Sequence, residues 1–131
     1  MKIVVVRAGS GRYGIPVKQV QSIERLLPIR PVPGVAGHIL GVANLRGSVI
    51  AVQDFRQLLG AREEPPTVDA RLLVTQGNGF LVDAALDVVE VDERSIETVG
   101  EPEQRVWNRG GRDLVVLVDL PGAHREEQAG A

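Results

Sequence analysis

The sequence of 131 residues has the length of one ordinary domain, and its formal net charge of −2 gives no support to nucleic-acid binding, which depends on a basic surface. Cysteine is absent, which excludes disulfides, thiolate nucleophiles and cysteine-ligated metal sites. The apolar run after Met1 is too short for a signal-peptide core or a membrane span. We therefore expect a soluble, cytoplasmic protein that does not insert into a membrane.

The composition predicts an all-β fold with short helical turns. Aromatic residues make up only 3% of the chain, so the core must be aliphatic, and the valine-rich runs favour strands. Glycine and proline divide the chain into segments of about 5 to 10 residues, a spacing typical of β-barrels and sandwiches. The expected strands are 3–7, one that starts near 13, 39–43, 48–54, 71–75, 80–83, 86–91 and 113–120.

The connections between these strands carry signals of their own. Val17, Val20 and Ile23 recur at three- and four-residue intervals, which fits either a short helical turn or an irregular strand. The prolines between 28 and 33 forbid a helix and favour an extended connection. The other expected connections are a helical turn over 55–60 closed by Gly60, an exposed loop over 63–66, a polar stretch over 92–105 and a flexible tail over 123–131.

The two halves of the sequence repeat the same order of features. Gly9-Ser10-Gly11 corresponds to Gly77-Asn78-Gly79 at an offset of 68 residues (77 − 9). Residues 49–55 match 114–120 at an offset of 65 (119 − 54). This similarity predicts two related β subdomains that arose by duplication.

Enzyme signatures are missing from the sequence. His38 and His124 lie far apart, and neither has a carboxylate or a second histidine at metal-ligand spacing. Asp54 and Asp119 occupy equivalent repeat positions, but each is expected to end a strand and cap the following turn. The glycine-rich turns lack the lysine and helix of a P-loop. We therefore expect no catalysis, no metal and no cofactor.

The stretch from Gly41 to Gly47 places one charged residue between two apolar runs. A turn must interrupt the hydrophobic pattern here, so Arg46 lies at a loop tip or in a cleft. Two interpretations stay open. Arg46 is either a solvated turn arginine, or its guanidinium group orders neighbouring loops or meets acidic groups of a partner.

Several motifs together resemble the CheW family of bacterial chemotaxis coupling proteins. They are Tyr13-Gly14-Ile15-Pro16-Val17, Val20-Gln21-Ser22-Ile23, Pro31-Val32-Pro33, Ile39-Leu40-Gly41-Val42-Ala43-Asn44-Leu45-Arg46-Gly47 and Val52-Gln53-Asp54-Phe55-Arg56. The resemblance is strongest from Tyr13 to Gly60. Its most specific element, Gly-Val-x-Asn-Leu-Arg-Gly, is shared with the regulatory domain of the kinase CheA.

The resemblance implies a fold of two packed SH3-like five-stranded β-barrel subdomains on a shared hydrophobic core. A single CheW-like domain would then cover 1–131 and consist of two interleaved subdomains. The first barrel is expected over 13–67, and the second over 68–122 together with an N-terminal strand near 1–12.

The resemblance also implies an adaptor rather than an enzyme. Such a protein joins the cytoplasmic tip of a methyl-accepting chemoreceptor to the regulatory domain of a CheA-type histidine kinase, and it is recruited to receptor arrays at the inner membrane. The alternative is a stand-alone CheW-like regulator that binds only one of these partners and competes or sequesters. An enzyme on a β-barrel scaffold is disfavoured, because no nucleophile, base and orienting group can be assembled.

The family's partner-contacting positions fall on Val20, Ser22, Gly41, Asn44, Arg46 and Gly47. Arg46 resembles the arginine at the turn apex, near the groove between the two barrels. Ser22 stands where many members carry glutamate, so an acidic contact to a partner is expected to be lost. The segment 95–113 looks short, with its apolar strand reduced to Val106 and Trp107, which implies a trimmed second barrel.

Overall fold

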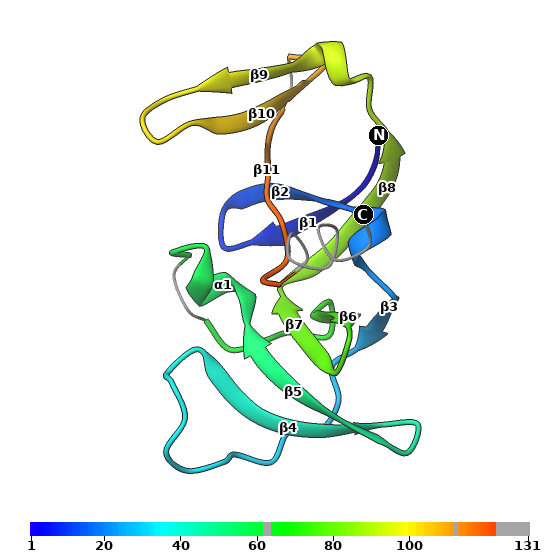
Figure 1. Ribbon diagram of the computed structural model, residues 1–131, viewed down its shortest axis with the longest axis vertical. Coiled ribbons are helices and arrows are strands. Elements are labelled where there is room, and N and C mark those ends of the chain that lie inside the picture. The colour runs from blue at the N-terminus through cyan, green and yellow to red at the C-terminus, as the bar shows by residue number, and fades with distance from the viewer. Residues whose placement is uncertain (62–63, 112, 123–131) are drawn as a thin grey trace. The chain divides into compact units, whose positions relative to one another are not determined.

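The computed structural model describes residues 1–61, 64–111 and 113–122, and strands dominate these ranges (Figure 1). The helical elements are short: the 3-10 turns η1 (Val17–Gln19) and η2 (Glu93–Ser95), and the one-turn helix α1 (Phe55–Leu58). The strands are β1 (Lys2–Ala8), β2 (Gly11–Pro16), β3 (Ser22–Arg25), β4 (Ile39–Leu45), β5 (Ser48–Asp54), β6 (Arg71–Thr75), β7 (Asn78–Val82), β8 (Ala84–Glu90), β9 (Ile96–Val99), β10 (Gln104–Arg109) and β11 (Asp113–Leu117). The predicted all-β class with short helical turns is confirmed.

The strands form two sheets, and the chain divides into two compact units. Unit 1 contains Met1–Val6, Arg12–Gln19 and the described residues from Leu86 onward, whereas unit 2 contains Arg7–Gly11 and Val20–Ala85. This division differs from the expected barrel boundaries, 13–67 and 68–122. The reason is that β6 and β7 pair with β3 and β5, so the chain stays in unit 2 beyond the point where the repeat suggested a boundary.

Unit 2 holds the five-stranded sheet, in the order β3-β6-β7-β5-β4. β5 and β7 run parallel, and the other neighbours are antiparallel. Alternate residues of β5, such as Ile50 and Val52, point inward, as the two-residue period of a strand requires. The core is aliphatic, as predicted, and contains Ala43, Ile50, Val52, Ala70, Leu72, Val74 and Leu81.

The two edges of this sheet are brought together by the chain that follows β3. Arg30 and Val42 of β4 form an isolated antiparallel bridge with N···O distances of 2.8 and 2.9 Å. Gly41 permits this approach, because a Cβ at that position would lie 2.7 Å from the Arg30 carbonyl carbon. The sheet therefore curls so that its edges meet, as in a barrel.

Unit 1 holds most of the six-stranded sheet, in the order β8-β1-β2-β11-β10-β9. Its core contains Ile3, Val5, Val91, Val115 and Leu117. The expected polar stretch over 92–105 and the reduced strand at Val106 and Trp107 are wrong, because β9 and β10 form an antiparallel hairpin there. β9 is mostly exposed and so shows no inward-facing alternation that would have revealed it.

The parallel strand pairs reveal the internal repeat residue by residue. Val52 lies opposite Gly79 in β5 and β7, and Leu117 lies opposite Gly14 in β11 and β2. A single offset of 65 residues relates both pairs (117 − 52 and 79 − 14). The register of the sheets supports the predicted duplication at the offset of 65. The loops Gly9-Ser10 and Gln76-Gly77 lie 67 residues apart (76 − 9), close to the predicted offset of 68.

The described local connections follow the sequence. After β2 the chain contains both alternatives that its spacing left open, η1 and then β3. α1 ends shortly before Gly60, whose φ of 74° suits a glycine. Asp119 follows β11, and its Oδ1 accepts a hydrogen bond from Gln19 Nε2 at 2.7 Å, so its expected role as a cap of the following turn stays a prediction. The expected flexible tail lies outside the described residues.

The equivalent glycines Gly14 and Gly79 predict different costs for the same substitution. A Cβ on Gly14 would lie 2.8 Å from Ile3 Cδ1 and from Leu117 Cδ2, whereas a Cβ on Gly79 would lie 3.1 Å from Ile50 Cδ1. We expect Gly14→Ala to destabilise the protein by about 1–3 kcal/mol, the usual cost of overpacking, and Gly79→Ala by less than about 1 kcal/mol. Urea unfolding measures both, and an equal cost at the two positions would contradict this difference in space.

Candidate functional site

The predicted Asn-Leu-Arg-Gly turn is the two-residue loop of the β4–β5 hairpin. Leu45 pairs with Ser48, and the loop residues Arg46 and Gly47 have φ angles of 49° and 88°. Two successive positive φ angles are those of a type I′ turn, whose twist matches that of the paired strands. Asn44 supports the turn, because its Oδ1 accepts a hydrogen bond from the Gly47 N–H at 2.9 Å.

Arginine is an unusual residue for the first position of such a turn. A positive φ brings the Cβ of an L-residue close to the next carbonyl, so asparagine and glycine are preferred there. Gln76 has the same position in the β6–β7 hairpin, with a φ of 38°, so the backbone conformation alone does not mark a site. The contacts of the Arg46 side chain are what distinguish it.

The Arg46 guanidinium group forms a bidentate ion pair with Glu24 of β3. Nη1 donates to Oε1 at 3.1 Å and Nη2 donates to Oε2 at 2.8 Å. The Arg46 side chain is 68% exposed, whereas that of Glu24 is only 18% exposed. The pair thus connects the turn with the opposite edge strand of the same sheet and presents the remaining N–H groups of Arg46 outward.

The ion pair changes the acid–base properties of both partners. It lowers the pKa of Glu24 from its ordinary value of 4.5 to about 2, chiefly through the hydrogen bond from Arg46 and secondly through one from Ser22. It raises the pKa of Arg46. Ser22 therefore supports the carboxylate that holds Arg46, and Glu24 supplies an acidic group two residues beyond the position where we expected one to be lost.

An open groove lies beside the hairpin in unit 2. Its volume is about 660 Å³, and it is lined by Pro28, Ile29, Arg30, Pro31, Val42, Ala43, Asn44 and Val49. Val49 is 69% exposed, which is unusual for a valine, whereas the next residue along β5, Ile50, is only 3% exposed. A largely apolar groove with a charged turn at its side is suited to bind another protein.

The structure gathers most of the predicted site residues in this region. Asn44, Arg46 and Gly47 form the turn, Ser22 lies beside Glu24, and Gly41 lets the groove wall at Arg30 approach β4. Val20 is half-buried before β3 and does not line the groove. Sequence reasoning missed Glu24, because its place beside the turn depends on the meeting of the sheet edges. It also missed the exposure of Val49, which lies opposite Asn44 in the hairpin. Whether Arg46 also borders a groove between two barrels stays a prediction.

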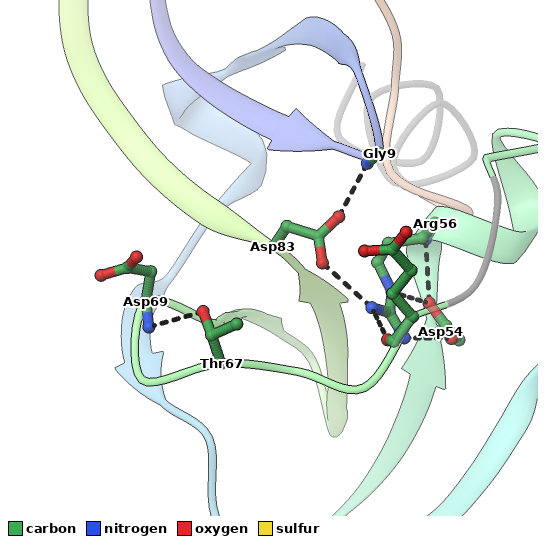
Figure 2. A network of polar contacts seen from close by, with 7 residues as sticks. Gly9, Asp54, Arg56, Thr67, Asp69 and Asp83 are labelled. Atoms are coloured by element: carbon green, nitrogen blue, oxygen red, sulfur yellow. Dashed lines mark hydrogen bonds and ion pairs between the residues drawn. The ribbon is translucent and has the colours of Figure 1, made fainter.

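A second polar cluster, around Arg56, was not predicted (Figure 2). Asp54 caps α1, as expected, by accepting a hydrogen bond from the Arg56 backbone N–H at 3.1 Å. Its carboxylate also holds Arg56 Nε and Nη2, each at 3.0 Å. Arg56 Nη1 donates to Asp83 Oδ1 at 3.0 Å and to the Glu64 carbonyl at 2.7 Å. The side chains of Arg56 and Asp54 are only 5% and 2% exposed, so this cluster is structural.

The Arg56 cluster is held together by opposite charges in a buried place. Hydrogen bonds to Asp54 and then to Asp83 raise the pKa of Arg56, although burial acts in the opposite direction. A buried charge is tolerated only when its partners are complete. The sequence contained one signal, an aspartate that ends a strand two residues before an arginine, but nothing in it pointed to Asp83.

The part of the chain that the structure describes shows no other chemical centre. Within residues 1–61, 64–111 and 113–122, no three His, Cys, Asp or Glu side chains gather in a way that could hold a metal ion. Over the same ranges, no helix is long and apolar enough to cross a membrane.

Known proteins resemble this chain over nearly its whole length. The CheW-like domain family matches residues 2–128. The chain is 30% identical to the chemotaxis protein CheW of Rhizobium meliloti (strain 1021), over 97% of this chain and 89% of that protein. It is 38% identical to the chemotaxis protein CheW of Bacillus subtilis (strain 168), over 79% of this chain and 69% of that protein. The crystal structure of the scaffolding protein TtCheW from Thermoanaerobacter tengcongensis matches with a TM-score of 0.81 and 25% identity, over 93% of this chain and 86% of that chain.

Together, the two-sheet fold and these similarities define a chemotaxis scaffold protein with two SH3-like subdomains. The chain belongs to the CheW family, as its motifs predicted.

The low pKa of Glu24 predicts a specific pH dependence of stability. Its folded pKa of about 2 lies below the ordinary value of 4.5, so the charged form stabilises the fold above pH 4.5, and this contribution is lost as the pH falls from 4.5 to 2. We expect the stability difference between wild type and Glu24→Gln to be constant above this window and to shrink within it. Urea unfolding at stepped pH measures it, and parallel curves for the two proteins would contradict the ion pair.

Arg56 is expected to be essential for stability. Replacement by leucine removes the counter-charge of Asp54 and Asp83, whose side chains are 2% and 14% exposed. Breaking a buried ion pair in this way costs about 3–5 kcal/mol. Chemical denaturation of Arg56→Leu measures the loss, with Arg94→Leu as a control, because Arg94 pairs with Asp92 at an exposed place. A loss no larger than that of the control would refute this role.

Proposed function

We propose that this protein is a non-enzymatic adaptor that couples chemoreceptors to a CheA-type histidine kinase. Its partners are the regulatory domain of the kinase and the cytoplasmic tip of a methyl-accepting chemoreceptor. The place of action is the cytoplasm, at receptor arrays of the inner membrane. Membership of the CheW family and the similarity to a scaffolding protein support chemotaxis signalling partners in general, and the turn at Arg46 supports a protein contact at a particular place.

The observation that carries this proposal is the Arg46 turn. Asparagine or glycine would suit the backbone at this position better, so arginine is kept at some conformational cost. Glu24 fixes the guanidinium plane from one side, while the side chain stays 68% exposed. A pre-oriented, exposed set of donors beside the apolar side chain of Val49 is what a protein interface needs, because little side-chain entropy is lost on binding.

The proposal of a non-catalytic role draws support from the paired acids. Asp54 is committed to Arg56 and to the cap of α1. Asp119 accepts one hydrogen bond, from Gln19. A general acid or base needs a carboxyl group that can reach a substrate and exchange its proton, and the Asp54 side chain, which is 2% exposed and paired with Arg56, does not meet this requirement.

Replacement of Arg46 by asparagine provides the central test. Arg46→Asn creates an Asn-Gly turn, which is preferred for type I′ geometry, and this gain opposes the loss of the ion pair with Glu24, so the melting temperature should change little. Affinity for a receptor-tip fragment should fall about tenfold or more, because a multidentate charge-assisted contact at an interface is lost. Arg46→Lys should restore only part of the affinity, since a point charge cannot reproduce the planar fork. Calorimetric titration beside thermal unfolding measures both properties.

Gln76→Asn is the matched control for this substitution. Gln76 has the same turn position and a positive φ in the β6–β7 hairpin. The Gln76→Asn variant should gain the same relief of backbone strain without any loss of affinity for the receptor fragment. Equal affinities of wild type and Arg46→Asn would return Arg46 to a solvated turn residue.

Separate titrations with the receptor fragment and the kinase regulatory domain distinguish the two proposed roles. An adaptor binds both partners at once, whereas the alternative, a stand-alone regulator, binds only one and competes. A protein that binds neither would refute both roles.

A further inference from the structure

The carboxylate of Asp83 is shared between two separate segments of unit 2. Oδ1 accepts the hydrogen bond from Arg56 Nη1 at 3.0 Å, and Oδ2 accepts one from the backbone N–H of Gly9 at 2.7 Å. Gly9 lies in the β1–β2 turn, Gly9-Ser10, and the Asp83 N–H donates to the carbonyl of Arg7, near the end of β1, at 2.9 Å. Figure 2 shows Asp83 between Gly9 and Arg56. The β1–β2 turn is therefore fixed through Asp83.

Arg56 Nη1 is shared in the same way. It donates both to Asp83 and to the Glu64 carbonyl, while Asp54 holds Nε and Nη2 and thereby sets the plane of the guanidinium group. Because that plane is fixed, Nη1 can donate hydrogen bonds to both Asp83 and the Glu64 carbonyl in only one position. Loss of either acceptor leaves a buried donor with an incomplete set of partners.

The segment 64–70, here called the strap, is anchored at its C-terminal end, where Ala70 is buried in the core of unit 2. Residues 64–69 are exposed, and Val68 is 91% exposed. Pro65 and Pro66 have no N–H to donate. Within the strap, the Asp69 N–H donates to Thr67 Oγ1 at 3.2 Å and the Ala70 N–H donates to the Thr67 carbonyl at 3.1 Å. At the C-terminal end of the strap, Arg71 Nη1 of β6 donates to the carbonyls of Val68 and Ala70 at 3.1 and 2.8 Å. The Glu64–Arg56 bond connects the other end of the strap to the folded sheet.

We propose that Arg56 and Asp83 form a two-sided latch, which makes the strap and the β1–β2 turn open and close together. Both segments line the same hollow of about 370 Å³. Gly9 and Ser10 come from the turn, Arg7 from the end of β1, and Glu64, Pro65 and Thr67 from the strap, while Asp83 completes the lining. Release of the strap removes one hydrogen-bond acceptor of Arg56 Nη1. The hydrogen bond from Arg56 to Asp83 then becomes weaker, and so does the hydrogen bond from the Gly9 N–H to Asp83. The latch is independent of the partner contacts proposed at Arg46.

The chain contains a matched control for this latch. Asp92 and Arg94 repeat the local geometry of Asp54 and Arg56: Asp92 caps η2 and accepts from Arg94 N, Nε and Nη2 at 2.9, 3.2 and 3.0 Å. Arg94 is 92% exposed, and among the described residues no second carboxylate pairs with it. Arg94→Lys thus perturbs the same aspartate–arginine motif without touching a latch.

Hydrogen exchange in the full chain tests the proposal. Arg56→Lys keeps the charge but cannot hold Asp54, Asp83 and Glu64 at the same time. The amides of Gly9 and Ala70 should both exchange about tenfold faster or more in this variant, although Arg56 touches neither of these amides. Asp83→Asn should accelerate the exchange of the same two backbone amides. The asparagine side chain has only one oxygen, so its NH2 group must face either Arg56 Nη1 or the Gly9 N–H, which are both donors. Arg94→Lys should leave both amides unchanged.

Faster exchange at Ala70 with unchanged exchange at Gly9 in Arg56→Lys would overturn the latch, as would unchanged exchange at both. If Arg56→Lys does not fold, the wild-type protein provides the second measurement. Native-state exchange at low denaturant should then give one opening free energy and one denaturant dependence for Gly9 and Ala70. Separate values for the two amides would show that the segments open independently and would refute the proposal.

Discussion

The candidate site in unit 2 depends on two backbone hydrogen bonds between Arg30 and Val42. They join the chain that follows one edge strand, β3, to the other edge strand, β4, which are the ends of the order β3-β6-β7-β5-β4. Glu24 and Arg46 are 22 residues apart, and they meet only because the edges meet. The same bridge forms one wall of the groove beside Val49. Gly41 is therefore a requirement of the site as well as of the fold, since any side chain there would force Arg30 away.

The sequence was informative where local chemistry decides the structure. Valine-rich runs, the glycine-containing turns and the Asn-Leu-Arg-Gly motif predicted the aliphatic sheets and the β4–β5 hairpin. Prediction failed where tertiary contacts decide. β9 is mostly exposed and so lacks the alternation of a half-buried strand. Glu24, an ordinary acidic residue in the sequence, gains its role from a turn on the opposite sheet edge. The contact of Asp119 with Gln19, 100 residues away in the sequence, likewise depends on the tertiary fold.

Asp54–Arg56 and Asp92–Arg94 show how burial changes the meaning of one local motif. The hydrogen-bond geometry is nearly the same, but Arg94 is 92% exposed and Arg56 is 5% exposed. At the surface, water solvates both charges, and the pair contributes little to stability. In the interior, a second carboxylate, that of Asp83, and the Glu64 carbonyl complete the set of hydrogen-bond acceptors around the guanidinium group. The motif itself can be read from sequence, but its burial cannot.

The parallel pairing of β2 with β11 has a consequence for synthesis on the ribosome. Arg12 and Val115 pair across 103 residues (115 − 12), whereas Ala51 and Asn78 pair across only 27 (78 − 51) in the equivalent pair of β5 with β7. Contacts between distant residues form more slowly, because a longer loop must be closed. When the ribosome has added residue 82, all five strands of the unit 2 sheet have been synthesised, but β11, the neighbour of β2, has not. Until then the nascent chain carries an unpaired strand edge, the kind of surface that chaperones protect from aggregation.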